Sequence, residues 1–257
     1  MEWRDEGVIL SVRKHGETSA IAEILTPQHG RCLGLVRGGR SRQQRPVLQP
    51  GNFVAATWRA RIEEHLGTFV FEPLKLSAGT IMEDSFRLSG LTTLAGLTHV
   101  LPEREPHQRL YAAFQIVLDA MDRDEHWPAL LVRWELGLLE ELGFGLDLSK
   151  CAVTGISNNL AYVSPKTGRA VGQLAGEPYH DRLLQLPGFL LGQPVTSDGD
   201  ILLGFKLTGY FLERHIFEPR GLEMPQSRSR IIAELAQRTG LIVGIEGDKR
   251  DISCSGV

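Results

Sequence analysis

The sequence is poor in cysteine and has no long apolar run. Its 257 residues include three cysteines, none of them close to another: Cys32, Cys151 and Cys254. An odd number of separated cysteines provides neither a disulfide framework nor the four thiolates of a structural zinc site. No window approaches about 18 uncharged apolar residues, and the first residues carry acids where a signal peptide would carry basic residues. We therefore expect a cytoplasmic protein with reduced thiols and no membrane segment.

Motifs that would indicate an enzyme are also missing. The chain contains no G-x-x-x-x-G-K-[ST], no H-E-x-x-H and no G-x-S-x-G, and no G-x-G-x-x-G follows a predicted strand. The eight histidines share no metal-ligand spacing. Asp198 and Asp200 could hold a divalent cation, but they fit better in the first turn of a helix, where they accept backbone N–H groups. We predict no catalytic residue, no metal and no cofactor; a hydrolase with an unfamiliar site is the weakest alternative.

Positive charge is concentrated near the start of the chain. The net charge is -3, but residues 1–80 carry 11 Lys+Arg against 8 Asp+Glu, and the remainder carries 17 against 23. Between Ile24 and Ile62 there is no acidic residue, and seven arginines give this stretch a charge of +7. Such a stretch attracts a polyanion by long-range electrostatic steering.

The first part of the chain has the pattern of a small barrel. Period-two alternation and turn glycines predict five strands, over residues 7–14, 19–25, 30–36, 52–59 and 67–72. Five strands in so short a segment favour an OB-fold, although an SH3-like barrel has a similar pattern. The aromatic residues of these strands could stack on bases, but a place in the core explains most of them better: Phe53, Trp58, Phe69 and Phe71.

After residue 77 the apolar spacing changes to that of helices. Apolar residues three to four apart predict three helices between Gly79 and Gly143, of which the first runs from about Met82 to Leu101. Two more helices are predicted over 199–217 and 227–239. We therefore expect an α+β protein with an OB-fold domain at 1–77 and a mostly helical domain at 78–257. A hairpin-like knuckle is expected within the helical domain at about 149–176.

The glycine- and arginine-rich segment 37–46 is the clearest candidate for binding. Glycines allow close backbone approach and guanidinium groups pair bidentately with phosphates, so such a loop can hold a nucleic-acid backbone without reading bases. The alternative is a solvated loop with no function. Its place between strands of a small barrel favours binding. We predict phosphate contacts from Arg37, Arg40, Arg42 and Arg45, assisted by Arg31, Arg59 and Arg61.

The order and spacing of several short segments resemble the RecO DNA repair proteins. These segments are 7–10, 16–19, 25–31, 36–41 and 48–51 in the first part, and 133–139 and 142–148, leading into Cys151, in the second. The resemblance implies an N-terminal OB-fold and a helical C-terminal domain. It also implies a bacterial, nucleoid-associated recombination mediator of the RecF-type pathway.

The same resemblance implies the partners. Proteins of this family bind single- and double-stranded DNA, anneal complementary strands, partner RecR and help load a recombinase on DNA coated by single-stranded DNA-binding protein. Some members have a four-cysteine zinc module where this chain has its knuckle. Here Thr154 replaces the second cysteine and residues 168–172 contain none, so zinc is not carried over.

The helical domain is negatively charged and therefore suits protein docking better than DNA binding. The acidic C-terminal tail of single-stranded DNA-binding protein would need an apolar groove rimmed by basic residues, and Arg133 on the predicted helix is a candidate. The main alternative function belongs to another class: a protein-interaction scaffold whose barrel docks an acidic partner instead of DNA.

Overall fold

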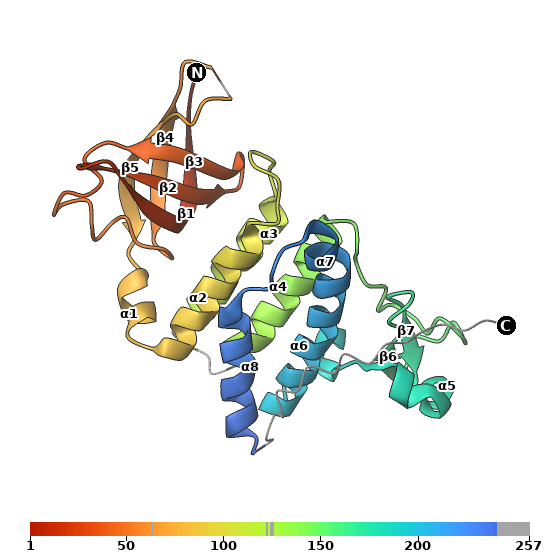
Figure 1. Cartoon of the computed structure of the whole chain (residues 1–257). Helices are drawn as coiled ribbons and strands as arrows, with labels where there is room; N and C mark the ends of the chain where they lie inside the picture. Colours follow the sequence, from red (N-terminus) through yellow and green to blue (C-terminus); the bar gives the residue numbers. More distant parts are fainter. Residues whose placement is uncertain (63, 122, 124–125, 241–257) are drawn as a thin grey trace.

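The protein has a β-barrel at one end, a helical bundle in the middle and a small sheet at the other end (Figure 1). The structure is a computed structural model, and it describes residues 1–62, 64–121, 123 and 126–240. Cys254 and the last part of the predicted helical domain lie outside the described residues. Within the described residues, no helix is long and apolar enough to cross a membrane.

The five predicted strands are confirmed and form a closed barrel. They are β1 (Glu2–His15), β2 (Ser19–Thr26), β3 (Gly30–Val36), β4 (Phe53–Arg59) and β5 (Thr68–Lys75). The order around the barrel is β1-β2-β3-β5-β4, with β3 and β5 parallel and the other neighbours antiparallel. This is the five-stranded closed sheet expected of an OB-fold.

The aromatic residues of the barrel strands lie in the core, as predicted. Trp58, Phe69 and Phe71 are 2–6% exposed and pack with the alternating apolar residues of β2 and β3. Phe53 is equally buried, but it faces the helices instead of the barrel interior. None of these four rings is therefore available on the outer surface to stack on bases.

The first helical region differs from the prediction at its start. The structure has α1 (Ala78–Met82), α2 (Ser85–Thr98), α3 (Gln108–Met121) and α4 (Trp127–Glu141). The helical conformation is interrupted between α1 and α2. Asp84 caps the start of α2 by accepting hydrogen bonds from the backbone N–H groups of Phe86 and Arg87. The predicted single helix from Met82 was wrong there, because its apolar spacing continues across the break.

The later helices agree with the prediction. They are α6 (Asp198–Leu212), a π-helical turn (Glu213–Phe217), α7 (Glu218–Arg220) and α8 (Gln226–Arg238). Asp198 and Asp200 lie in the first turn of α6, and Ser197 caps it by accepting from the Asp200 N–H at 3.2 Å. The interpretation of these acids as a helix start is confirmed.

The knuckle is a small antiparallel sheet that extends further than predicted. It contains β6 (Leu160–Val163), β7 (Ala170–Gly172) and β8 (Leu184–Gln185), with α5 (Gln173–Gly176) and the 3-10 helix η1 (Glu177–Arg182) between the last two. A second 3-10 helix, η2 (Gly188–Leu191), follows. The predicted end at 176 was too early because β8, which is only two residues long, pairs with β6.

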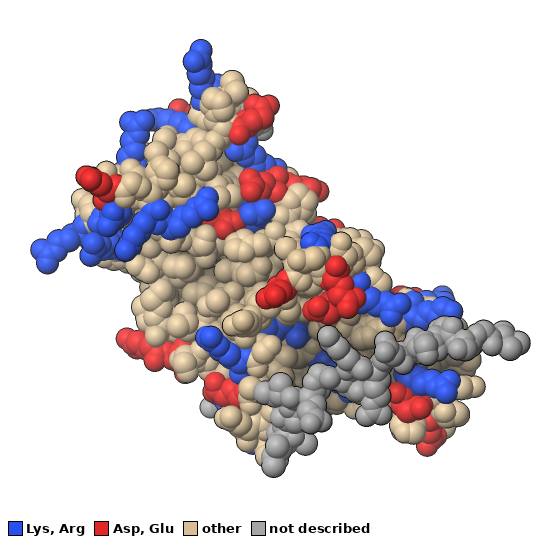
Figure 2. Space-filling model, viewed as in Figure 1, with Lys and Arg blue, Asp and Glu red and all other residues tan. Residues whose placement is uncertain are grey.

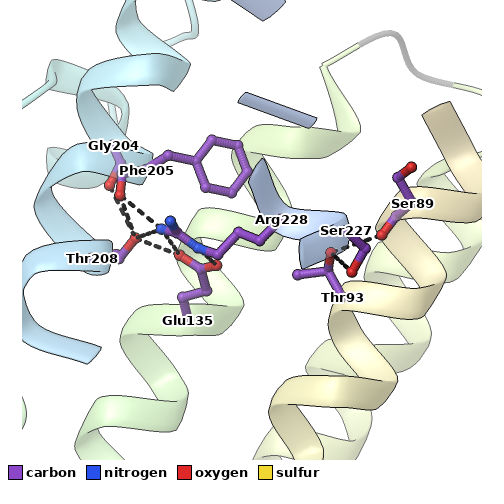
Figure 3. A network of polar contacts seen from close by, with 8 residues as sticks. All are labelled: Ser89, Thr93, Glu135, Gly204, Phe205, Thr208, Ser227 and Arg228. Atoms are coloured by element: carbon purple, nitrogen blue, oxygen red, sulfur yellow. Dashed lines mark hydrogen bonds and ion pairs between the residues drawn. The ribbon is translucent and has the colours of Figure 1, made fainter. Parts of the chain in front are cut away.

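A buried ion pair joins three helices of the bundle (Figure 3). The Arg228 guanidinium of α8 contacts both carboxylate oxygens of Glu135 on α4, at 2.7 and 3.0 Å. Arg228 also donates to the Phe205 carbonyl of α6 at 2.7 Å, and the Thr208 hydroxyl donates to Glu135. Glu135 is fully buried and the Arg228 side chain is 7% exposed. The charges are therefore paired within the interior of the bundle.

The barrel and the bundle share one apolar core. Val8, Leu25 and Phe53 of the barrel belong to the same cluster as Leu94 and Leu97 of α2. The backbone of the β2–β3 turn also lies against the segment that precedes α3. There is no room for a side chain at Gly30, because a Cβ would lie 1.9 Å from the Glu105 carbonyl oxygen. The barrel is thus packed directly on the bundle.

Candidate nucleic-acid interface

The arginine-rich loop, residues 37–48, is a compact structure attached to the end of the barrel. It leaves β3 after Val36, and Leu48 returns into the barrel core with 4% exposure. Arg40 fixes the loop to the β1–β2 turn, because its guanidinium donates to the carbonyls of Gly16 and Glu17 at 2.9 and 2.7 Å. The loop is held by these bonds and by its own buried leucine.

Within this loop the arginines have different roles. The Arg45 Nε donates to the Arg40 carbonyl at 3.3 Å, so both residues help to shape the loop. Arg37 and Arg42 are exposed and make no hydrogen bond or ion pair with any other described residue. Their guanidinium groups are therefore available to an anion.

The strand register brings Arg59 to the same side of the barrel. Leu35 at the end of β3 pairs with Thr68 of β5, which pairs with Arg59 of β4. Two strand spacings, about 10 Å, therefore separate Arg59 from the strand that leads into the loop. Arg59 forms an exposed ion pair with Glu2 at 2.8 Å, and this hydrogen bond lowers the pKa of Glu2. Arg61 is exposed in the β4–β5 connection.

Arg31 is separated from the other predicted arginines. Its side chain is only 14% exposed, and it contacts Glu23 at 2.6 Å, Glu103 at 3.7 Å and the Leu101 carbonyl at 3.3 Å. The segment between α2 and α3 covers this part of the barrel. Arg31 is therefore engaged within the protein, and its guanidinium joins the barrel to the helical domain.

Glu23 is the centre of this junction. Its carboxylate accepts from Ser11 at 3.0 Å and contacts Arg31 and His99, the latter at 2.9 Å. Burial acts to raise the pKa of Glu23, but the hydrogen bonds to His99 and Arg31 outweigh it and lower the pKa to about 2. The carboxylate is therefore charged at neutral pH and stabilises contacts between the barrel and the helices.

Sequence reasoning missed two basic residues of this surface. Arg13 and Lys14 are exposed at the end of β1, next to the turn that Arg40 binds. Arg13 pairs with Ile21, which pairs with Leu35, so Arg13 lies two strands from Leu35 on the side opposite to Arg59. They lie outside the acid-free stretch, but the predicted hairpin turn was a signal that could have found them. Lys and Arg side chains gather on the barrel in Figure 2.

Arg133 lines a hollow of about 290 Å³ on the surface of α3 and α4. Arg109 lies at the same hollow, and Ala113, Trp134 and Gly137 contribute apolar wall. The Arg133 guanidinium donates to the Phe189 carbonyl at 2.6 Å and lies 6.0 Å from the centre of the Phe189 ring. Glu140 and Glu141 also line the hollow. It thus combines apolar wall, two arginines and two acids.

Both parts of the chain match family models. The model described as Recombination protein O N terminal matches residues 1–75, and Recombination protein O C terminal matches residues 82–222. The chain belongs to the RecO family of DNA repair and recombination proteins. RecO proteins from Methylorubrum extorquens strain PA1 and Mesorhizobium japonicum are 51% and 50% identical to it. These alignments cover 91% and 96% of this chain, and 98% and 99% of the relatives.

The knuckle of this RecO chain does not fit a zinc ion. Cys151 is buried, its N–H donates to the Ile156 carbonyl at 2.8 Å, and its Sγ accepts from the Gly172 N–H at 3.2 Å. A hydrogen bond from Thr154 is the main cause that lowers the pKa of the thiol to about 7. No group of three or more His, Cys, Asp or Glu suited to a metal occurs among the residues the structure describes. Hydrogen bonds hold the knuckle at the position of the single cysteine.

Proposed function

We propose that this RecO chain is a recombination mediator that binds single- and double-stranded DNA and anneals complementary strands. It would also help to load a recombinase on DNA coated by single-stranded DNA-binding protein, in the RecF-type pathway. The observation that carries the proposal is the anchored loop on an OB-fold barrel, in which Arg37 and Arg42 are exposed and have no ion-pair partner among the described residues. We propose that the protein acts in the cytoplasm, at the nucleoid.

Annealing of this kind requires no catalytic residue. Two polyanionic strands repel each other, and a surface that neutralises their phosphates concentrates both and screens the repulsion. Guanidinium groups suit this task because they remain charged and pair bidentately with phosphate oxygens. We therefore propose a mediator that works without chemistry or cofactor.

The proposed phosphate contacts follow from exposure. Arg37 and Arg42 are the main contacts, with Arg45, Arg59 and Arg61 beside them. Arg40 contributes charge while it holds the loop in place. We add Arg13 and Lys14, and we assign Arg31 to the domain junction, because its charge is already paired. The domain boundary that we propose, at residue 77, leaves all of these residues in the barrel.

Replacing Arg37 and Arg42 together with alanine should weaken the salt dependence of DNA binding. Each lost contact with single-stranded DNA reduces the slope of log affinity against log salt by about 0.7, so the double variant should lose about 1.4. Fluorescence anisotropy with a labelled strand over a salt series measures this slope.

The matched control removes two arginines from the helical domain. Arg182→Ala with Arg230→Ala changes the net charge equally, and both residues are exposed and remote from the loop in sequence. The control should keep the wild-type slope. Equal slopes for all three proteins would contradict the loop assignment, and no binding at low salt would favour the scaffold that docks an acidic protein.

We further propose that RecR and single-stranded DNA-binding protein are partners. The hollow beside Arg133 is the proposed site for the acidic, hydrophobic tail of the latter. Ala113 and Gly137 offer small apolar contacts, and Arg109 and Arg133 offer positive charge for carboxylates.

Arg133→Ala should weaken binding of such a tail peptide about tenfold, because a charge-assisted hydrogen bond contributes on the order of 1.5 kcal/mol. Titration of the labelled peptide by anisotropy measures the change. Arg230→Ala, which removes an exposed arginine on α8, should bind the peptide like the wild type. An unchanged dissociation constant for Arg133→Ala would move the peptide site elsewhere.

A further inference from the structure

A second cavity, of about 320 Å³, lies at the end of the barrel where β1 begins. It is lined by the first residues of β1, by the β2–β3 turn, by the end of β4 and by the segment that precedes α3. Its volume is at the lower end of the range for small-ligand sites. None of the arginines proposed to contact phosphates lines it.

Stacked aromatic rings form its wall. The Trp3 ring lies parallel to the His29 imidazole, with centroids 4.0 Å apart and planes inclined by 9°. Trp3 also lies beside Trp58, at 5.8 Å and 16°. The Trp3 residue is partly exposed and the His29 side chain is 33% exposed, so this stack reaches the surface.

Arg104 adds a cation to the cavity. Its guanidinium carbon lies 5.5 Å from the centre of the Trp58 ring, and it donates to the His65 carbonyl at 2.8 Å. Its backbone has φ of 63°, in the left-handed region that costs energy for a residue other than glycine. The Arg104 N–H donates to the Arg31 carbonyl at 2.9 Å, which holds this conformation.

Basic residues lie close to the cavity. Two nearby carboxylates have partners: Glu2 forms an ion pair with Arg59 at 2.8 Å, and Asp5 lies 3.0 Å from a ring nitrogen of His29. Arg59 follows Trp58 directly in the chain, and Arg61 lies two residues further. A ligand with a flat aromatic ring and a phosphate chain could therefore place its ring in the cavity and its phosphates on these arginines.

We propose that this cavity binds one unpaired nucleobase of a DNA strand whose phosphates contact the barrel arginines. The inference rests on the proposed function and deepens it, because it gives the barrel a contact to bases in addition to phosphates. A base would stack on the partly exposed His29 ring, which Trp3 supports from within the protein, and such stacking accepts any base because every base has a π face. The cation of Arg104 adds to the attraction for an aromatic ring.

The test compares two labelled strands of equal length in anisotropy titrations with the full chain. One strand is oligothymidine, and the other has the same phosphates but abasic sugars throughout. The wild type should bind oligothymidine about tenfold more tightly, since stacking on one aromatic site contributes about 1–3 kcal/mol per base. Trp3→Leu should lose most of this preference and keep its affinity for the abasic strand.

Three further variants identify the cause. Trp3→Phe retains a ring and should keep most of the preference, and His29→Leu, which changes a partly exposed turn residue, should reduce it. Tyr179→Leu removes an aromatic side chain that is 58% exposed in the knuckle, and should change nothing. Circular dichroism confirms that each variant is folded before its titration; His29→Leu carries the test if Trp3→Leu is not.

The outcomes separate this inference from the proposed function. Equal affinity of the wild type for both strands would overturn the nucleobase site and leave phosphate binding intact. A fall in affinity for both strands in Trp3→Leu would also overturn it, because that result indicates a structural role. Binding to neither strand would overturn the proposed function and the nucleobase site together.

Discussion

Glu135→Leu should lower the free energy of unfolding by about 3–5 kcal/mol, because it leaves the Arg228 guanidinium buried without its counter-charge. The Glu135 side chain is fully buried, and Arg228 has the Phe205 carbonyl and the Thr208 hydroxyl as its remaining partners. Urea denaturation followed by circular dichroism measures the change.

The double variant is the decisive control for this prediction. Glu135→Leu with Arg228→Met removes both charges and fills the space with apolar side chains, so it should recover most of the lost stability. Glu72→Gln breaks the exposed pair with Arg4 and should cost less than about 1 kcal/mol. If Glu135→Leu cost as little as Glu72→Gln, the ion pair would not stabilise the bundle.

Acidification should remove about 3 kcal/mol of stability through Glu23 alone. Its pKa is about 2 in the folded protein and 4.5 as a free group. A lowered pKa stabilises the folded state above pH 4.5, and this contribution is lost as the pH falls from about 5 towards 2. The wild type should therefore lose stability in this range beyond what its other carboxylates cause.

Glu23→Gln isolates the contribution of this residue. At pH 7 the variant should be less stable than the wild type by about 3 kcal/mol, and the difference should shrink as the pH falls below 4.5. Glu72→Gln removes an exposed carboxyl on β5. The difference in stability between this variant and the wild type should not shrink in the same way at low pH. Urea titrations at several pH values measure the difference, and a gap that stays constant down to pH 2.5 would refute the assignment.

The fold was largely predictable because its elements have clear periods. Alternation and turn glycines placed all five barrel strands, although β1 begins at Glu2, five residues before its predicted start at residue 7. The break between α1 and α2 was not predicted, because the apolar spacing continues through Asp84 while a local cap interrupts the backbone. The third strand of the knuckle, β8, was missed because a strand of only two residues is too short to show an alternating pattern.

The candidate site was predictable in its charge but less so in its geometry. Arg37 and Arg42 are exposed as the glycine-rich loop suggested, whereas Arg31 lies under a segment about 70 positions later in the chain. The aromatic cavity was not anticipated, because it combines Trp3, His29, Trp58 and Arg104 from four separate segments. Neighbours that meet only through folding leave no pattern in a single sequence.

The shared core couples the stability of the barrel to that of the bundle. Val8, Leu25 and Phe53 would be exposed if the barrel separated from α2, so opening of one domain disturbs the other. A DNA strand that binds only to the barrel would then stabilise the bundle as well. Binding raises the free energy of unfolding by RT ln(1 + [L]/Kd), where [L] is the concentration of free DNA. Occupancy of the barrel would thereby also protect the helices from unfolding and proteolysis, although no nucleotide touches them.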